Sequence, residues 1–429
     1  MIIRRDRYLN RLIERMNNGQ IKVITGIRRC GKSYLLFGLF SDYLRRNGVD
    51  DSHIIELALD DDLNEHLRDP QKLSNFIRAR IKPEGNYYVL LDEIQYAISR
   101  KEMRNPDNPV KLYSVLNGLL RLPNVDIYVT GSNSKMLSTD IVTEFRGRGD
   151  TVAVHPLSFA EYYDWKGGDK ASAYEEYAYY GGMPLVWSKR SAEAKYQYLQ
   201  GLFQEVYYKD IQERYQLDHP GVLDELTDVL CSSIGSLTNV SKLANTLKSV
   251  KKLDVNHATI GTYLNCLTEA FLFRCAKRYD VKGKHYFDYP MKYYCEDIGL
   301  RNAHLNYRQQ EETHIMENIL YNELIARGYS VDVGVVPVSD KDADGKRHQR
   351  RCEIDFVVNT ASGRYYIQSA LTVADPEKLQ QEKRPLLAVR DSFQRIVVSK
   401  TVAKPWFDET GIKHMGLYDF LLDENALSS

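Results

Sequence analysis

Short runs of hydrophobic residues alternate with longer, helix-like segments along the first third of the chain. A short hydrophobic run bounded by polar residues is typical of a buried strand, whereas hydrophobic residues at every third or fourth position are typical of a helix with one buried face. The helix-like segments include residues 33–44 and 110–122, and the strand-like runs lie at residues 21–25, 53–59, 87–91, 126–130 and 151–155. This alternation predicts an α/β domain built on a parallel sheet.

The pattern becomes helical after residue 158. Residues 159–217 have helical spacing, interrupted by GGMP at 181–184, and predict a helical lid and connector. Short helices and a hairpin follow, which is the order expected of a winged helix-turn-helix. The last segment begins with the helix HIMENILYNELIARG and continues into strands. We therefore expect four parts, at residues 1–158, 159–220, 221–308 and 309–429.

The composition narrows the class of protein without indicating its chemistry. With 429 residues, of which 43% are hydrophobic, the chain is long enough for several globular domains. Lysine plus arginine and aspartate plus glutamate number 58 each, so attraction to nucleic acid or to a membrane has to come from a local patch. The first residues, MIIRRDRYLNRL, are rich in charge, and the chain has no run of about 18 apolar residues. We therefore expect a cytoplasmic protein without a membrane span.

Cysteine and histidine residues are scattered along the chain. The six cysteines form no C-x-x-C pair, and the ten histidines show no ligand spacing. Zinc sites need closely spaced ligands, and disulfide scaffolds need paired cysteines. The sequence therefore favours reduced thiols and argues against both kinds of site.

The stretch GIRRCGKS at residues 26–33 satisfies the phosphate-loop pattern G-x-x-x-x-G-K-[ST]. It lies between a predicted strand and a predicted helix, which is the context that the pattern requires. Glycines let backbone N–H groups curl around a phosphate at a helix N-terminus, Lys32 would neutralise the β and γ oxygens, and Ser33 would hold Mg²⁺. The predicted ATP contacts are Gly26, Ile27, Arg28, Arg29, Cys30, Gly31, Lys32, Ser33 and Tyr34.

A pair of acids follows the third predicted strand, in the stretch YYVLLDEIQ. At the end of that strand Asp92 and Glu93 would lie beside the phosphate loop. We expect Asp92 to bind Mg²⁺ through water and Glu93 to polarise the attacking water.

Two further stretches offer polar groups to the same site. The fourth predicted strand ends in TGSNS, where Thr130, Ser132 or Asn133 would sense the γ-phosphate or orient water. The same residues also fit a turn that caps the next helix. The stretch EFRGRGD supplies Arg146 and Arg148, one of which would reach the nucleotide of a neighbouring subunit as an arginine finger. The alternative for either is an ordinary solvated arginine, and a finger between subunits would make hydrolysis depend on oligomerisation.

These motifs, with others in order along nearly the whole chain, resemble a family of prokaryotic AAA-type ATPases whose nucleotide domain is followed by a C-terminal domain of unknown function. The matching pieces are TGIRRCGKS, YYVLLDEIQ, VTGSNSKML, FRGRG, HPLSFAEYY, YGGMPLV, YYKDIQERY, KYYCEDIGLRNA, MENILYNELIARGY and EIDFVV. The resemblance implies a P-loop ATPase core of the additional-strand class, a helical lid, a winged-helix domain and a tail with a restriction-endonuclease-like fold.

The same resemblance bears on individual residues. It matches Arg28 and Arg29 to a pair of arginines inside the family's loop, and it matches Gly147-Arg148 to a GR after the sensor helix, which favours Arg148 as the finger. Cys30 stands where many relatives have serine, and this exchange of one small residue for another is not expected to disturb phosphate binding.

The tail has most of a nuclease-like acid pattern but lacks two of its functional groups. Nucleases of the PD-(D/E)xK type use two carboxylates to hold Mg²⁺ and a lysine to help activate water. Here Gln368 stands where the second acid belongs and Ala370 stands at the lysine position, so we predict no nuclease activity. The degenerate site comprises Glu317, Glu353, Asp355 and Gln368.

The winged-helix segment has basic residues beside its predicted recognition helix, but few on it. Asn256 would cap this helix, Ile260, Leu264 and Leu267 would face inward, and the outward side has no Arg or Lys. Basic residues before the helix and in the wing suit phosphate contacts without base readout. An intramolecular brace with solvated lysines is the alternative. The candidate phosphate contacts are Lys242, Lys277, Arg278, Lys282 and Lys284.

The leading hypothesis is an oligomeric, Mg²⁺-dependent ATPase that couples hydrolysis to binding or remodelling DNA. Its rival is an ATP-controlled switch or scaffold whose tail recruits a protein partner. A motor is expected to hydrolyse ATP quickly and to be stimulated by DNA, whereas a switch is expected to be slow and indifferent to DNA. An ATP-dependent nuclease is a third hypothesis, which Gln368 and Ala370 disfavour.

Overall fold

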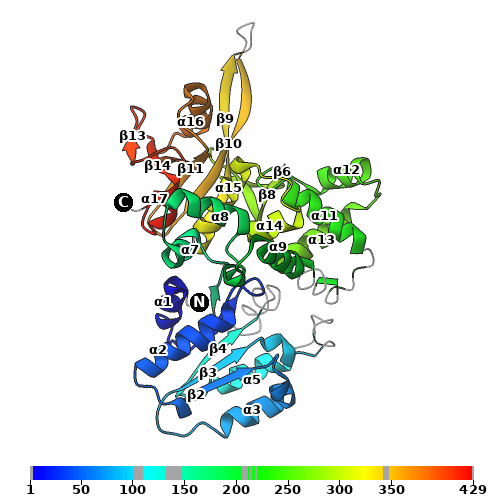
Figure 1. Ribbon diagram of the computed structural model, residues 1–429, viewed down its shortest axis with the longest axis vertical. Coiled ribbons are helices and arrows are strands. Elements are labelled where there is room, and N and C mark those ends of the chain that lie inside the picture. The colour runs from blue at the N-terminus through cyan, green and yellow to red at the C-terminus, as the bar shows by residue number, and fades with distance from the viewer. Residues whose placement is uncertain are drawn as a thin grey trace. The chain divides into compact units, whose positions relative to one another are not determined.

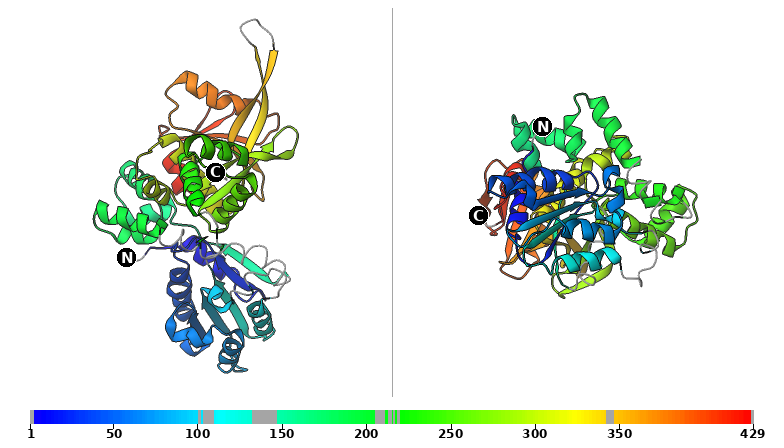
Figure 2. Two further views of the ribbon diagram at one scale, coloured as in Figure 1. Left: turned by 90° about the vertical axis from the view of Figure 1, so that its right-hand side faces the viewer. Right: turned by 90° about the horizontal axis from the view of Figure 1, so that it is seen from below.

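The computed structural model describes residues 3–99, 102, 110–131, 147–204, 211–212, 215, 217, 220–341 and 347–427. Of the predicted site residues, Asn133 and Arg146 lie outside these ranges, as does Ser132. The chain divides into two compact units, drawn in Figure 1 and from two further sides in Figure 2. The N-terminal unit comprises Ile2–Pro156 with Glu269–Phe271, and the C-terminal unit comprises Leu157–Thr268 with Leu272–Ser429.

A five-stranded parallel sheet forms the centre of the N-terminal unit, with the strand order β2-β3-β4-β1-β5. Because β4 lies between β1 and β3, one strand separates the strand before the phosphate loop from the strand before the acid pair. The predicted parallel α/β sheet is confirmed, and its strands are β1 (Ile21–Thr25), β2 (Ile54–Ala58), β3 (Tyr87–Asp92), β4 (Val125–Thr130) and β5 (Gly149–Ala153).

Helices pack against both faces of this sheet (Figure 1). Successive strand residues point to opposite faces, so one strand serves two layers. Val23, Val89 and Val129 pack with α3 and α5 on one face, and on the other Phe40 contacts Tyr128 with their ring centroids 4.5 Å apart. The helical elements of the unit are α1 (Asp6–Ile13), the π-helical η1 (Tyr34–Phe40), α2 (Ser41–Arg46), α3 (Pro70–Arg78), α5 (Lys111–Leu119) and the short turns η2 (Asp51–His53), η3 (Asp62–Leu67) and η4 (Ile94–Ala97).

A nine-stranded mixed sheet forms the centre of the C-terminal unit, with the order β13-β14-β12-β11-β10-β9-β7-β8-β6. Parallel pairing of β7 with β9 joins the strands of the winged-helix segment to those of the tail. The expected boundary between residues 308 and 309 therefore falls between strands of one sheet. These strands are β6 (Leu237–Thr238), β7 (Phe273–Asp280), β8 (His285–Cys295), β9 (Ser330–Lys341), β10 (Arg347–Asn359), β11 (Arg364–Ala370), β12 (Gln394–Ser399), β13 (Trp406–Phe407) and β14 (Lys413–Gly416).

The helices expected to form a lid belong to the C-terminal unit, where α8 and α9 pack against α14. Buried Asp297, just before α14, accepts hydrogen bonds from the N–H of Gly182 (2.6 Å) and of Leu300 (2.9 Å). The Asn302 amide donates to the carbonyl groups of Ala178 and Tyr179, at 2.9 and 3.0 Å. The GGMP and EDIGLRN stretches are thus two sides of one hydrogen-bonded junction. The helices named here are α7 (Phe159–Lys166), α8 (Lys170–Tyr180), the short η5 (Pro184–Ser188), α9 (Ala192–Gly201) and α14 (Ile298–His304).

The predicted recognition helix is α13 (His257–Glu269), which follows α11 (Pro220–Ser232) and α12 (Val240–Val250) and precedes the β7–β8 hairpin. The Asn256 side chain accepts from the N–H of Thr259 at 2.7 Å, as expected of a cap. Ile260, Leu264 and Leu267 are buried as predicted. The remaining helices are α15 (Glu312–Ala326), α16 (Pro376–Leu387) and α17 (Leu417–Leu422). Across the described ranges, no helix is both long enough and apolar enough to span a bilayer.

Candidate nucleotide site

The phosphate loop connects the end of β1 to a helix that begins at Lys32. Gly26 and Gly31 have φ angles of 144° and 100°, which side chains rarely allow. A Cβ atom on Gly26 would also overlap the carbonyl oxygen of Val154, and the Cys30 Sγ lies 3.4 Å from the same oxygen. The loop therefore folds tightly onto the end of the β5 segment and leaves a helix N-terminus facing outward, which is an anion-binding arrangement.

Lys32 is buried, and its ammonium lies inside the curve of the loop. The Nζ atom donates to the carbonyl oxygens of Gly26 and Ile27, at 3.0 and 3.1 Å. Ser33, Tyr34 and Arg29 are exposed at the mouth of the loop. The structure thus places the nine predicted ATP contacts in one loop and the first turn of one helix.

Asp92 lies at the end of β3 and is buried next to the loop serine. Burial raises the pKa of Asp92 above its usual range, and the nearby carboxylates of Glu93 and Asp60 raise it further. Hydrogen bonds from the hydroxyl groups of Thr130 and Ser33 act in the opposite direction. Ser33 and Asp92, which are far apart in sequence, are therefore in direct contact.

Glu93 adopts a left-handed backbone conformation, with φ 51° and ψ 55°. Its N–H donates to the Thr130 Oγ1 at 3.0 Å, and the same Thr130 hydroxyl donates to the Asp92 carboxylate. The Gln95 amide donates to the Glu93 carboxylate. Strained backbone of this kind costs about 1–3 kcal/mol and is concentrated at functional sites. Thr130 therefore bonds to the Glu93 backbone and to the Asp92 carboxylate instead of projecting freely as a sensor. Gln95, the last residue of YYVLLDEIQ, is a site residue for which no role was predicted.

These groups fit a magnesium ion bound together with a triphosphate. Among the described residues, no cluster of three or more His, Cys, Asp or Glu side chains could hold a metal. Mg²⁺ is usually held by one or two carboxylates plus substrate phosphates, so such a cluster is not required. The contact between Ser33 and Asp92, with Glu93 and Asp60 nearby, supplies a hydroxyl and negative charge beside the phosphate loop.

Comparison with known proteins agrees with this geometry. A family model described as an AAA domain matches residues 18–163, and one described as a domain of unknown function matches residues 171–311. An uncharacterized protein of Haemophilus influenzae is 33% identical over 430 residues, which cover 98% of this chain and 99% of that protein. The chain belongs to this family of AAA-domain proteins. The resemblance expected from the motifs is thus confirmed. An uncharacterized protein of Methanocaldococcus jannaschii is also similar, with 26% identity over 91% of this chain and 83% of its own length.

Solved structures add little to the assignment. The Aeropyrum pernix Orc1 protein in complex with DNA is similar over 71% of this chain and 93% of its own, with 12% identity and a TM-score of 0.30. Cdc6p from Pyrobaculum aerophilum is similar over 73% of this chain and 93% of its own, with 11% identity and a TM-score of 0.28. Scores at this level establish neither a shared overall fold nor a shared function.

In the five-stranded sheet, Arg148 lies next to the first residue of β1, whereas the phosphate loop of the same chain follows the last residue of β1. Its carbonyl oxygen accepts from the N–H of Ile21, the first residue of β1, at 2.8 Å, and its side chain is exposed. The loop begins after the last residue of β1, five residues further on, which at 3.3 Å per residue is roughly 16 Å away. Arg148 is therefore at the other end of β1 from the phosphate loop of its own chain.

In the C-terminal unit, the predicted nuclease-like residues come together around a lysine that was not predicted. Lys292 on β8 is 3% exposed, and its Nζ lies 2.6 Å from the Glu353 carboxylate, 2.8 Å from that of Glu317 and 3.8 Å from that of Asp355. The Gln368 amide donates to the Glu382 carboxylate at 2.8 Å, and its oxygen accepts from the backbone N–H of Asp355 at 3.4 Å. Lys292 is the first residue of the stretch KYYCEDIGLRNA, but that stretch does not show its role, because the three acids that it contacts lie on α15 and β10.

The electrostatics of this acidic cluster are dominated by the buried ammonium. Burial lowers the pKa of Lys292, but the carboxylates of Glu317, Asp355 and Glu353 outweigh burial and raise it overall. Burial and the neighbouring Glu317 raise the pKa of Asp355 well above its usual range, against the opposing effect of Lys292. Ala370, at the motif's lysine position, packs instead in a hydrophobic cluster with Leu386 and Val397. Lys292 thus acts as an internal counter-ion to the acids.

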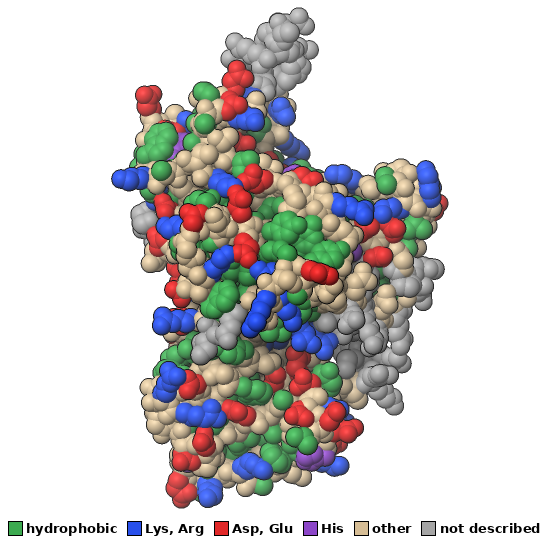
Figure 3. All heavy atoms as spheres, in the orientation of Figure 1, with side chains coloured by type: hydrophobic (Ala, Val, Ile, Leu, Met, Phe, Trp, Pro, Cys, Tyr) green, Lys and Arg blue, Asp and Glu red, His purple; other side chains and the backbone are tan. Residues whose placement is uncertain are grey.

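The candidate phosphate contacts lie on two parts of the C-terminal unit. Lys277, Lys282 and Lys284 are exposed on the β7–β8 hairpin. Lys242 is exposed on α12, where Figure 3 shows Lys and Arg side chains gathered. Arg278 is half-buried, with its guanidinium 5.3 Å from the ring centroid of Phe287, and that ring is 5.4 Å from the guanidinium of Arg351. The hairpin thus combines exposed lysines with an aromatic ring that lies near two arginines, Arg278 on the hairpin and Arg351 on β10.

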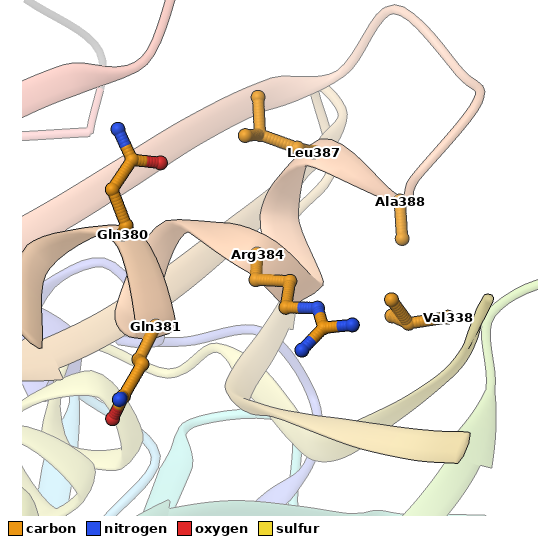
Figure 4. Close-up of a pocket in the computed structure, with 6 residues that line it drawn as sticks. All are labelled: Val338, Gln380, Gln381, Arg384, Leu387 and Ala388. Atoms are coloured by element: carbon orange, nitrogen blue, oxygen red, sulfur yellow. The ribbon is translucent and has the colours of Figure 1, made fainter. Parts of the chain in front are cut away.

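A hollow of about 480 Å³ lies between β9 and α16, and Figure 4 shows its lining. The Arg384 guanidinium is directed toward Val338, whereas Gln380 and Gln381 point to opposite sides. Leu387 and Ala388 complete the lining. Because none of these six side chains is an acid or a nucleophile, the hollow does not supply a catalytic constellation.

Proposed function

We propose that the AAA domain binds and hydrolyses ATP with Mg²⁺, and that the C-terminal unit binds DNA through its phosphates in an oligomer. The contact between Ser33 and Asp92 beside the buried Lys32 carries the ATPase part of this proposal. It joins the two motifs that the chemistry requires, although they are 59 residues apart in sequence.

Each residue has a role that follows from its position. Lys32 neutralises phosphate oxygens from inside the loop, and Ser33 and Asp92 hold Mg²⁺, which supplies positive charge to the transferring phosphoryl group. Glu93, held by Gln95 and by its strained backbone, orients and polarises the attacking water. Arg148 of a neighbouring subunit stabilises the negative charge of the transition state.

Two substitutions test the ATPase site. Lys32→Ala is expected to abolish ATP binding, whereas Glu93→Gln is expected to bind ATP without hydrolysing it, because it removes the base and leaves the loop intact. Titration with a fluorescent ATP analogue and phosphate release measure the two steps separately. Lys72→Ala and Glu65→Gln, at exposed positions on the same unit, are matched controls. Turnover near the wild-type rate in either site variant contradicts the assignment.

The basic hairpin supports the DNA-binding part of the proposal. Its exposed lysines suit phosphate contacts, while α13 exposes His257, Thr262 and Asn265 and carries no Arg or Lys for base readout. The double variant Lys282→Glu/Lys284→Glu is therefore expected to weaken DNA binding for all sequences. Lys170→Glu/Lys404→Glu changes the net charge equally at exposed positions of the same unit and is expected to have a smaller effect.

The measurement is DNA binding by Glu93→Gln protein with ATP across a salt series, because phosphate contacts predict a steep loss of affinity with salt. Absence of binding at low salt, together with slow turnover that DNA does not change, would instead support a nucleotide-controlled switch that recruits a protein partner.

A further inference from the structure

Arg5 is buried behind the phosphate loop and is 2% exposed. It precedes α1 in a run of charges that reads as surface in the sequence. Its Nη1 donates to the carbonyl oxygen of Cys30 at 2.9 Å, and its Nη2 donates to that of His155 at 2.6 Å. One guanidinium therefore joins three segments: the N-terminal helix, the loop and the end of the β5 segment.

The bond to Cys30 determines the orientation of a loop amide. The carbonyl of Cys30 and the N–H of Gly31 belong to one peptide group, which is planar and trans, so they point in opposite directions. Because Arg5 holds that carbonyl from behind the loop, the Gly31 N–H points to the opposite side. In a phosphate loop the amide groups on this side bind the phosphate oxygens.

The second bond fastens the loop to a fixed part of the AAA domain. The N–H of His155 donates to the Tyr8 hydroxyl at 3.4 Å, and the Arg5 guanidinium lies 4.6 Å from the centroid of the Tyr8 ring. Val154, the preceding residue, carries the carbonyl group that contacts Gly26 and Cys30. The loop thus rests on residues 154–155, which are followed by Pro156, the last residue of this stretch of the N-terminal unit.

We propose that Arg5 is a positioning residue for nucleotide binding, which holds the peptide between Cys30 and Gly31 in the orientation that receives the triphosphate. This inference rests on the proposed ATPase function. A guanidinium presents several N–H groups in a fixed planar fork, whereas a lysine ammonium is a single point on a flexible stem. Lysine at position 5 therefore retains the charge but does not reproduce both bonds.

The test compares Arg5→Met and Arg5→Lys with Arg4→Met and Arg4→Lys, because Arg4 is exposed next to it. Losing a charge-assisted hydrogen bond behind the loop is expected to raise KM and the Kd of ATP and ADP about 10- to 100-fold in both Arg5 variants. The kcat at saturating ATP is expected to stay near the wild-type value, since binding energy is lost equally from substrate and transition state. The Arg4 variants are expected to resemble wild type.

Four outcomes are distinguishable. Raised KM with retained kcat and a native circular dichroism spectrum supports the positioning role. Wild-type Kd and KM in folded Arg5→Met overturn it, and if that variant does not fold, wild-type values in Arg5→Lys overturn it equally. If both kcat and Tm fall while KM stays unchanged, Arg5 is a purely structural brace, and this result also overturns the proposal. If wild type and the Arg4 variants bind no ATP, the proposed function fails and the role of Arg5 falls with it.

Discussion

At the scale of single residues, Asp92 shows how the site opposes the stability of the fold. Its carboxyl group is buried and close to two other acids, so the folded protein holds a proton on Asp92 more tightly than the unfolded chain does. For an acid with a raised pKa, the contribution to stability is complete below the unfolded value of 3.8 and is lost as pH rises through the folded value. Above its folded pKa, the folded protein therefore bears the cost of this buried charge.

Asp92→Asn is accordingly expected to make the nucleotide-free protein more stable at pH 7 while abolishing hydrolysis, because the amide is uncharged and cannot replace the metal-binding carboxylate. The stability gain is expected to shrink as pH falls toward 4. Urea denaturation between pH 4 and pH 8 without nucleotide measures it, and Asp62→Asn, at an exposed carboxylate, is the control. An Asp92→Asn variant that is less stable than wild type at pH 7 would contradict this account.

How far single residues could be predicted depends on whether their role is local. The loop residues and the acid pair were predictable because their chemistry is contained in short motifs at the ends of strands. Arg5, Gln95 and Lys292 were not, because each acts through contacts that only folding creates. Thr130 was predicted as a polar group of the site, and the structure shows its hydroxyl bound to the Asp92 carboxylate and to the backbone N–H of Glu93.

At the scale of elements, hydrophobic runs identified the strands of the N-terminal sheet but could not reveal how the C-terminal strands pair. The β7–β9 pairing is parallel and joins residues 55 positions apart, such as Arg278 and Val333, and no periodicity encodes such a partner. The strands of the predicted wing, β7 and β8, and those of the tail consequently belong to one sheet, although the sequence pattern assigned them to two domains.

Lys292 helps to hold this shared sheet together, because its ammonium joins β8 to Glu317 on α15 and to Glu353 on β10. Lys292→Met leaves buried Glu317 and half-buried Glu353 without this counter-ion and is expected to lower the free energy of unfolding by about 3–5 kcal/mol. Thermal denaturation in EDTA measures the loss, with Lys277→Met on the neighbouring strand as the exposed control. Equal stability of Lys292→Met and wild type would show that the ammonium is dispensable.

Removing the ammonium also exposes oxygen ligands that a divalent ion prefers. Mn²⁺ is therefore expected to restore part of the stability of Lys292→Met, but not to stabilise protein that retains the lysine. Lys292→Met and protein that retains the lysine are compared in the Asp92→Asn background, so that the nucleotide site does not contribute.

With the ammonium in place, we expect no DNA cleavage in Mg²⁺ or Mn²⁺. Cleavage that is lost in both Asp355→Ala and Lys292→Met would show that this prediction is wrong.

At the scale of the whole molecule, the proposed role of Arg148 would make the active site a property of an assembly. The phosphate loop and Arg148 lie at opposite ends of β1 and its neighbour β5, so a single chain cannot bring them together without losing the β1–β5 pairing. If Arg148 takes part in hydrolysis, it does so on the nucleotide of another copy. Specific activity is then expected to rise with protein concentration until the oligomer is fully formed.

Mixing two inactive variants tests this arrangement directly. Arg148→Ala retains an intact loop but lacks the finger, and its kcat is expected to fall by about 10³ with little change in ATP affinity. Lys32→Ala lacks ATP binding but retains the finger. Because each variant supplies what the other lacks, an equal mixture is expected to hydrolyse ATP well above the sum of the two separate rates. Arg121→Ala, at an exposed arginine of the same unit, is expected to hydrolyse ATP near the wild-type rate without being mixed with a second variant. If co-purification shows mixed oligomers and their rate stays at the sum of the parts, Arg148 is not a finger that acts between subunits.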